Sequence, residues 1–403
     1  MTGRRGRRKC GRCNLLRRDV AVIRCRFVAT RRASLVVVAL FPGLLLSLNV
    51  AAFEIFENHP GTRAMGMAGV FTAQADDSSA IWYNPVGPKH YAAIKQDFSV
   101  EWGALAARGI ANNDSAEAAE LARSDATLKF AGLYRNGWRG DAGVDDVGFG
   151  FAYFSPYEFT TFVAAPRNPV DATPFGRITA RYRQVSAAIN KNVSQHASLG
   201  ATLDGVWTDI DCLDFSPCVQ HGPYGFGASV GMLYDIAKTQ NFSVTLGMTW
   251  RSRSALGYDT QATSGIGTVL TNYLPDRPEA RSIAISMKRP TRVALLNANL
   301  SYEQKRWAAA SDTALDLANV GVWGAGVEAL VALNGGDNVS LRLGAKHGTP
   351  TNGDDNSFNI WASGIGYGFA HRHAVDAAVE RRVNGGENKS STTVWSLSYS
   401  LQY

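Results

Sequence analysis

The C-terminal residues 395–403 read WSLSYSLQY and alternate large apolar side chains with small polar ones. Trp395, Leu397, Tyr399, Leu401 and Tyr403 share one parity, and serine and glutamine occupy the other. Alternation with period two places successive side chains on opposite faces of a strand. The stretch therefore predicts a β-strand with one apolar and one polar face.

The same alternation returns along most of the chain, between turn-forming residues. The segments are 96–104, 127–133, 147–154, 178–189, 197–207, 224–234, 241–250, 282–288, 294–302, 322–331, 339–345, 360–369 and 374–383. With the C-terminal strand they make about fourteen, or twelve if the weak segments 127–133 and 282–288 are not strands. Single-chain bacterial barrels have an even number of strands.

Three features favour a transmembrane antiparallel β-barrel over a soluble β-sandwich. The segments run about 9–11 residues, the length that crosses a bilayer at a tilt. Aromatic residues gather at their ends, as interfacial girdles require. The polar faces combine Gly, Ser, Thr and Asn with Arg, Lys and Asp, which suits a wet lumen. A helix-like insert at 114–122 is expected in a loop.

The first 52 residues differ in charge from the rest of the chain. They hold twelve Lys/Arg and one acid, so 29 of the 41 basic and 33 of the 34 acidic residues remain beyond them, a net charge of −4. Their Arg-rich start, apolar run 33–48 and small residues before Phe53 predict a cleaved signal peptide, with an over-long n-region. The alternative is a transmembrane helix over 33–53. The basic overall charge thus gives no reason to expect a nucleic-acid partner.

Three of the five cysteines, Cys10, Cys13 and Cys25, lie in that leader. Cys212 and Cys218 remain, six residues apart in a polar segment. In an oxidising compartment they could form a loop-closing disulfide, and two free thiols are the alternative.

Residues 53–95 lack sustained alternation and are too long for a linker, so we expect a compact segment inside the lumen. They contain FEI at 53–55, GTRAMGMAG at 61–69, ADDSSA at 75–80 and YNPVG at 83–87. This series resembles the N-terminal hatch of the FadL family of outer-membrane transporters for long-chain fatty acids and other hydrophobic compounds. Val86 departs from the alanine of the family's Asn-Pro-Ala. A related group, the PorV-like proteins, has a similar hatch motif.

The resemblance spans most of 53–403 and implies a monomeric barrel of fourteen strands, with the hatch (53–95) plugging the barrel (96–403). It implies the outer membrane of a Gram-negative bacterium, contact with membrane lipid, and passage through the barrel-assembly machinery. The implied activity is passive transport without a cofactor. The ligand, a fatty acid or an alkane or aromatic compound, would leave sideways where one strand is kinked.

Five residues are candidates for binding the transported molecule. By resemblance, Phe53 and Phe56 line an apolar pocket, and packing of the plug is the alternative. Arg63, Arg342 and Lys346 are cations that could meet a substrate carboxylate in a shielded lumen. The alternative for each is an ordinary ion pair across the lumen.

Four residues are candidates for gating. Asn84 and Pro85 form a turn signal inside the hatch series. Gly148 and Gly150, followed by Ser155-Pro156, are candidates for the strand kink, since glycine and proline weaken ladder pairing. A strand that simply ends at Pro156 is the alternative.

Two enzyme-like or metal-like motifs are weak. Ser229 lies in a Gly-x-Ser-x-Gly spacing, but within an alternating strand and not in a strand-to-helix turn. His371 and His373 have no third ligand nearby, and a hairpin turn explains them. Transport is therefore the leading hypothesis, no metal site is expected, and a PorV-like structural or secretion-linked barrel and a lipid hydrolase are the alternatives.

Overall fold

The computed structural model describes residues 53–87, 94–107, 120–122, 127–135, 147–164, 175–213, 221–256, 275–310, 317–350, 357–370, 372–384 and 390–402. The leader 1–52 lies outside these residues. Within these ranges, no helix is long and apolar enough to cross a membrane.

Fourteen antiparallel strands close into a barrel, because the last strand pairs with the first across 13 register positions from Ser390↔Ala107 to Gln402↔Lys95. The fourteen are β2 (Ile94–Ala107), β4 (Thr127–Arg135), β5 (Val147–Phe154), β7 (Phe175–Asn192), β8 (Ala197–Leu213), β9 (His221–Lys238), β10 (Ser243–Arg251), β11 (Glu279–Pro290), β12 (Ala294–Arg306), β13 (Val320–Ala332), β14 (Asn338–Pro350), β15 (Phe358–Phe369), β16 (His373–Asn384) and β17 (Ser390–Gln402).

Three shorter strands extend this sheet. They are β1 (Phe53–Glu57), β3 (Glu120–Ala122) and β6 (Tyr157–Ala164). β3 pairs with the C-terminal part of β2, beyond the part that pairs with β4. β6 follows β5 after a break of two residues. β1 belongs to the hatch.

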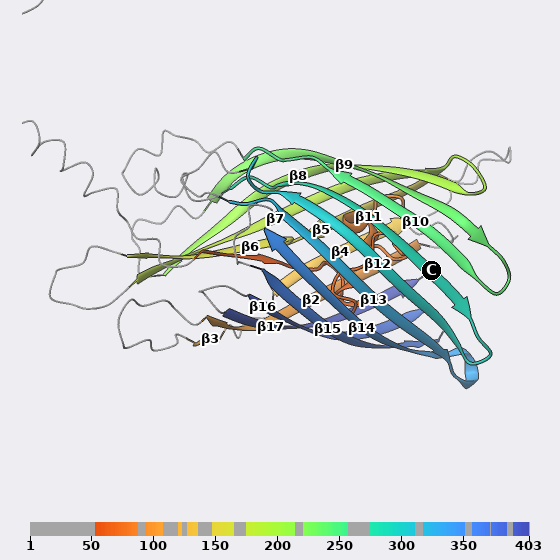
Figure 1. Cartoon of the computed structure of the whole chain (residues 1–403). Coiled ribbons are helices and arrows are strands. Elements are labelled where there is room, and N and C mark those ends of the chain that lie inside the picture. Colours follow the sequence, from red (N-terminus) through yellow and green to blue (C-terminus); the bar gives the residue numbers. More distant parts are fainter. Residues whose placement is uncertain are drawn as a thin grey trace, which may run out of the picture. The chain divides into compact units, whose positions relative to one another are not determined.

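Short hairpins such as β7–β8 and β15–β16 lie at one end of the barrel, and the long connections β10–β11 and β12–β13 lie at the other (Figure 1). Several strands extend toward the long connections well past the 9–11 residues expected, and β7 and β9 each have 18.

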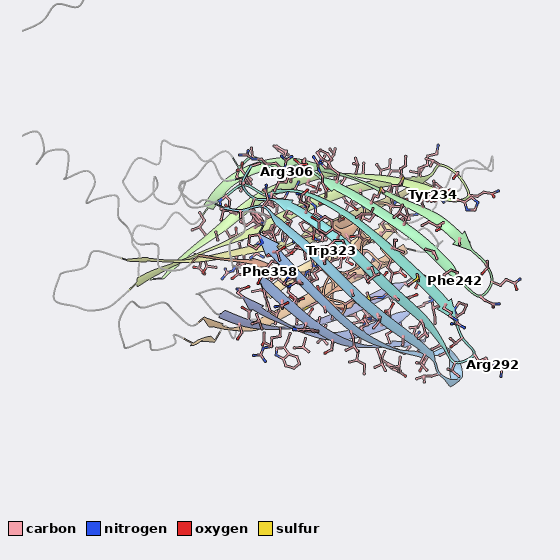
Figure 2. All side chains as sticks on the ribbon, viewed as in Figure 1. Tyr234, Phe242, Arg292, Arg306, Trp323 and Phe358 are labelled. Carbon is pink, nitrogen blue, oxygen red and sulfur yellow. The ribbon has the colours of Figure 1, made fainter. Side chains whose placement is uncertain are left out.

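Side chains alternate as the sequence predicts, with apolar residues outward. On β14, Leu341 and Leu343 are 53% and 61% exposed, whereas Arg342 between them is 4% exposed. Aromatic pairs lie along the outer face, such as Tyr302 and Trp323, whose ring centroids are 4.6 Å apart. Figure 2 places Trp323 on the outer wall and Tyr234 toward the short hairpins. An apolar band bounded by aromatic rings is what a bilayer requires of a barrel surface.

The hatch fills the lumen with residues 53–87, including the short helices α2 (Thr62–Met65) and α3 (Ala80–Tyr83). Within residues 57–87, all side chains except those of Glu57, Asn58, Arg63 and Asp76 are buried. Inward-facing glycines let the wall approach it: a Cβ on Gly200 would overlap the Pro85 carbonyl, and one on Gly344 would overlap the Met67 backbone. The expected luminal plug is therefore packed directly against the wall.

All fourteen predicted segments fall in strands, including the weak ones at 127–133 and 282–288. The helix-like prediction at 114–122 is wrong at its end, because Glu120–Ala122 pairs with β2 as β3. Its remaining residues lie outside the described ranges. Pairing with a neighbouring strand outweighs the local helical propensity of a Glu-Leu-Ala stretch.

Candidate functional site: the hatch and a break in the barrel wall

The barrel wall is interrupted between β5 and β6. β5 pairs with β4 on one edge and with β7 on the other. Beyond Ser155 and Pro156, β6 still pairs with β7, but its other edge pairs with hatch strand β1 instead of with β4. At this position the wall has a hatch strand where a continuous barrel would have the neighbouring wall strand.

Asn58 of the hatch binds the two carbonyls at this break. Its backbone N–H donates to the Pro156 oxygen at 2.9 Å, and its side-chain Nδ2 donates to the Ser155 oxygen at 2.8 Å. Proline has no N–H for the ladder. Buried carbonyls need a donor, so the hatch satisfies the groups that the broken ladder leaves.

Six aromatic side chains lie inside the barrel beside the break, and we call them the aromatic cluster: Trp82, Phe130, Phe154, Tyr157, Tyr182 and Trp307. Tyr157 is at its centre, with ring centroids 5.9 Å from Trp82, 6.1 Å from Tyr182 and 5.4 Å from Trp307. Such edge-to-face contacts are favourable. The cluster is an apolar region inside a lumen that is otherwise lined with polar groups.

Arg251 covers the far side of this cluster. Its guanidinium carbon lies 3.5 Å from the Trp82 ring centroid, and its Nη2 donates to the Trp82 carbonyl at 2.5 Å. A cation over an indole face is attracted by the ring quadrupole. The contact fixes α3 of the hatch to β10.

A compact group of charges, which we call the lysine cluster, lies where β1 ends. It consists of Glu57, His59, Glu303, Lys305, Lys346 and Glu380. Lys305 binds the Glu57 carboxylate directly, and its Nζ is 3.4 Å from Glu303. Burial would raise the pKa of Glu57, but Lys305, Lys346 and His59 together hold that pKa well below its ordinary value.

His59 links the second lysine of the group to Glu380. Lys346 Nζ is 3.1 Å from His59 Nε2, and His59 Nδ1 is 2.6 Å from Glu380. A lysine ammonium can only donate hydrogen bonds, so Nε2 of His59 accepts one from Lys346. The proton of the neutral imidazole is then on Nδ1, which donates a hydrogen bond to the Glu380 carboxylate. The imidazole therefore bridges β14 and β16 through the hatch.

A second charge network joins the opposite part of the hatch to the wall. Arg63 binds Glu328 through two hydrogen bonds and Asp76 at 2.7 Å. Arg342 binds Glu328 at 2.8 Å and Asp376 at 2.5 Å. Both guanidiniums are therefore already paired with carboxylates.

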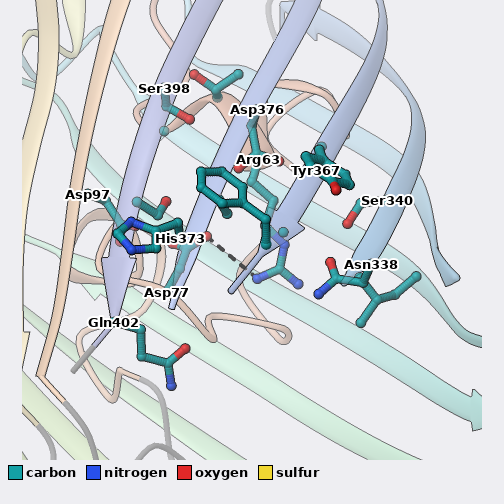
Figure 3. A pocket seen from close by; sticks show the side chains of 18 of the residues that line it. Arg63, Asp77, Asp97, Asn338, Ser340, Tyr367, His373, Asp376, Ser398 and Gln402 are labelled. Carbon is teal, nitrogen blue, oxygen red and sulfur yellow. Dashed lines mark ion pairs between the residues drawn. The ribbon is translucent and has the colours of Figure 1, made fainter. Parts of the chain in front are cut away.

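This network lines a polar pocket of about 310 Å³ at the short-hairpin end (Figure 3). Arg63, Asp77, Asp376, Ser398 and Gln402 are among its lining residues. Most of the groups around it are hydrophilic, so an apolar molecule in the aromatic cluster would be poorly solvated on that side.

The predicted site residues separate into two groups. Lys346 lies in the lysine cluster, and Arg63 and Arg342 lie in the second network. Binding of a substrate carboxylate by the two arginines stays a prediction. Such a carboxylate would have to compete with the ion pairs that both arginines already make. The backbones of Phe53 and Phe56 lie on β1, and their side chains lie outside what the structure describes.

The gating candidates occupy contact positions. Asn84 Nδ2 donates to the Thr72 oxygen at 3.0 Å and the Met232 oxygen at 3.1 Å, which joins the hatch to β9. Gly148 and Gly150 lie within regular β5, where they make room for Tyr134 and Ile81. The break itself falls later, at Ser155-Pro156. A gating role for these residues stays a prediction.

The remaining candidates add no chemistry here. Cys212 lies next to the end of β8, with its side chain outside what the structure describes. Cys218 and His371 lie outside the described residues. Ser229 Oγ lies 3.4 Å from Asp204. The Asp204 carboxylate also binds Arg277 at 2.8 Å, so its role is to hold that arginine in place.

Asn58, Glu57 and Lys305 are functional residues that were not predicted from the sequence. Glu57 and Asn58 directly follow the Phe-Glu-Ile motif at 53–55, and polar residues at the end of a short apolar stretch were the available signal. Their partners lie about 100 and 250 positions away. No local pattern could have connected them.

No family model and no curated protein matches the sequence. Solved structures do match the fold. A Pseudomonas aeruginosa FadL homologue is 14% identical with a TM-score of 0.56, over 86% of this chain and 99% of that one. The Ralstonia pickettii toluene transporter TbuX is 15% identical with a TM-score of 0.56, over 88% and 99%.

The monoaromatic hydrocarbon channel CymD is 15% identical with a TM-score of 0.51, over 89% of this chain and 99% of that one. At such identities the likeness concerns the fold, and it extends over nearly the whole of each relative. With its closed fourteen-stranded barrel and luminal hatch, the chain has the FadL-family fold.

Proposed function

We propose that this protein carries hydrophobic compounds passively across the outer membrane of a Gram-negative bacterium, with long-chain fatty acids as its main substrates. The observation that carries the proposal is the break at Ser155-Pro156, where β6 pairs with a hatch strand instead of with β4. A molecule could pass from the lumen to the lipid phase there without crossing a continuous ladder.

The distribution of polarity supports a sideways route. The aromatic cluster lies directly beside the break, and the pocket toward the short hairpins is polar. A hydrophobic molecule loses favourable apolar contacts when it enters a polar cavity. The lower-energy path from the aromatic cluster therefore leads through the wall into the bilayer.

The fold likeness supports the same class of function, because TbuX is a toluene transporter and CymD a monoaromatic hydrocarbon channel. Arg63, Arg342 and the lysine cluster place charged groups in the lumen. A hydrocarbon without a polar group would make no favourable electrostatic contact with them. This favours substrates with an acidic head group, and fatty acids are the simplest of these.

The test is uptake of radiolabelled oleate, and of radiolabelled toluene, by cells that lack their own transporter. A tether then tests the route: cysteines at Ile55 and Phe159, which face each other in register, would lock β1 onto β6 when oxidised. Cys212 and Cys218 are replaced by serine in this background. We expect oleate uptake that the oxidised tether abolishes and a reductant restores.

A matched tether joins positions Leu343 and Val327, which are also in register but far from the break. It should leave uptake unchanged. Toluene uptake without oleate uptake would replace fatty acids by aromatic substrates. Uptake of neither compound by correctly folded protein would contradict the proposal and favour the PorV-like alternative.

A further inference from the structure

We propose that the outer surface of the barrel carries a binding site for a phosphorylated glycolipid of the outer leaflet, in which Arg381 binds a lipid phosphate and a groove over β13–β16 takes the acyl chains. The inference goes beyond transport and shares with the proposed function only the location in the outer membrane. The site lies on the lipid-facing side of strands that take no part in the break at Ser155-Pro156.

A groove of about 510 Å³ crosses the outer surface of β13, β14, β15 and β16. It exists because small side chains face outward there: Ala325 lies opposite Ala345 in register, and Ser363 of the next strand also lines it. Larger outward side chains border it, namely Val327, Leu343, Trp361 and Val379. Neighbouring strands are about 4.8 Å apart, so four strands span roughly 14 Å. The groove is therefore wider than a single acyl chain.

Arg381 lies at one end of this groove. Its side chain is exposed and is in register with Trp361, whose ring is 62% exposed on the same outer surface. Among the residues that the structure describes, none forms an ion pair or a hydrogen bond with the Arg381 guanidinium. A charged side chain is costly on the lipid-facing surface unless it reaches the interface or a partner.

The wall offers no negative charge to Arg381 on this surface. Odd-numbered residues face outward on β13–β17, as the exposed Trp323, Leu343 and Trp395 show. No outward position of these five strands is acidic, and Arg381 is the only lysine or arginine among them. An anion from the surroundings is thus complementary to this surface.

The position of Arg381 along its strand places it at the outer edge of the bilayer. It lies three residues before the end of β16, and Trp323 and Trp361 lie three residues after the starts of β13 and β15. Exposed tryptophans mark the membrane–water interface. The long connections of bacterial barrels are extracellular, so these three side chains lie at the level of the outer-leaflet head groups.

The groove extends from Arg381 toward the middle of the bilayer. Val327 lies seven residues after the start of β13, and Leu343 lies seven residues before the end of β14. Both are therefore deeper in the membrane than Arg381 and Trp361. A cation at the interface with an apolar groove below it matches the order of head group and acyl chains in a lipid.

The chemistry of the site favours a phosphate on a sugar head group. A guanidinium can donate two parallel hydrogen bonds to a phosphate. Nearer the long connections than Trp361, the outward side chains of His347 and Asn359 contact each other at 2.9 Å and provide polar groups for sugar hydroxyls. Lipid A, the phosphorylated glycolipid of the outer leaflet, has both groups and several acyl chains, which suits the width of the groove.

The test measures lipid binding to the purified full mature chain in detergent by native mass spectrometry. The probes are phosphorylated lipid A, its dephosphorylated form and phosphatidylglycerol. One interfacial arginine should make the wild type prefer the phosphorylated form about fivefold. Arg381→Gln should remove this preference, and Arg381→Lys should keep part of it because the charge stays and the two-point contact is lost.

Arg281→Gln is the matched control for charge, because Arg281 is also an exposed arginine of the outer wall but is already paired with Glu279. It should keep the wild-type preference. Ala345→Phe fills the groove and should weaken both forms of lipid A severalfold. Ala201→Phe, at an outward position of β8 away from the groove, should change neither.

Three results would overturn the inference. Equal affinity of the wild type for the two forms of lipid A would show that Arg381 only extends its side chain to water. A preference that survives in Arg381→Gln would assign it to another cation. Phosphatidylglycerol that binds as tightly as phosphorylated lipid A would exclude a glycolipid site.

Transport is measured in the same variants, so that binding and transport can fail independently. Oleate uptake by Arg381→Gln and Ala345→Phe should equal that of the wild type, because both side chains face away from the lumen, and this also verifies that the variants fold. If the wild type prefers phosphorylated lipid A but takes up no hydrophobic compound, only the proposed function fails. If uptake is normal and the preference is absent, only this inference fails.

Discussion

The guanidinium of Arg63 in the hatch binds the carboxylate of Glu328 on β13 through two hydrogen bonds, Nε to Oε1 at 2.8 Å and Nη2 to Oε2 at 2.7 Å. The same carboxylate accepts from Gln74 and Asn297 at 2.8 and 3.0 Å. One wall residue thus anchors two hatch residues. The contact between Arg63 and Glu328 is bidentate, which makes it geometrically specific as well as strong.

Replacing Arg63 by Met should loosen the hatch. The change leaves Glu328 with Arg342 and removes the half-buried ion pair to Asp76. Breaking a fully buried pair costs on the order of 3–5 kcal/mol, and this half-buried pair should cost less. In planar bilayers we expect ion conductance to rise above the low level of the wild type. Arg281→Met, which breaks an exposed pair with Glu279 on the outer wall, is the control. Identical conductance in wild type and Arg63→Met would contradict an anchoring role.

Gly200→Leu should force the hatch away from the wall. A Cβ at Gly200 would overlap the Pro85 carbonyl, and backbone cannot move aside as a flexible side chain can. Overpacking of this kind costs about 1–3 kcal/mol or more. We expect faster proteolysis of the hatch in the folded barrel.

Gly205→Leu is the control on the same strand. Its Cβ would point to the outer surface and meet only Val185, at 3.5 Å. It should change stability by less than about 0.5 kcal/mol. Equal proteolysis rates for the two variants would show that the close approach at Gly200 is unimportant.

Asn58→Leu should weaken the contact between the hatch and the broken strand. The Ser155 carbonyl loses its donor, and an unsatisfied buried acceptor costs about 1–3 kcal/mol. Thiol labelling at Ile55→Cys should become faster. Asn359→Leu, at an exposed position where Asn359 contacts His347, should have no effect. Unchanged labelling in Asn58→Leu would mean that backbone pairing alone holds β1.

The docking of β1 should depend on pH only in the acid range. The pKa of Glu57 lies well below its ordinary value of 4.5, because Lys305, Lys346 and His59 outweigh its burial. A carboxyl with a lowered pKa stabilises the folded state fully above its unfolded pKa, and this contribution is lost as the pH falls toward the folded value.

Labelling at Ile55→Cys, measured with a reagent that reacts at low pH, should therefore be constant from about pH 5.5 upward and increase below about pH 4.5. Adding Glu57→Gln should remove this increase. An increase already complete above pH 6 would assign the dependence to a group other than Glu57.

The sequence alone determined the barrel. Its period-two alternation marked all fourteen wall strands, since exposure of one face to lipid and the other to the lumen acts on every second residue. It also predicted a luminal hatch, because residues 53–95 lack that alternation. These are local properties, and each can be recognised within about ten residues.

Only the tertiary structure decided how the hatch meets the wall. The break at Ser155-Pro156, its filling by β1, and the pairing of Glu57 with Lys305 depend on residues about 100 to 250 positions apart. From the sequence alone, Ser155-Pro156 could equally have marked the end of the strand. Which strand edge stays open, and which carboxylate reaches which lysine, follows from closing the barrel around its plug, because closure brings together groups that no local pattern relates.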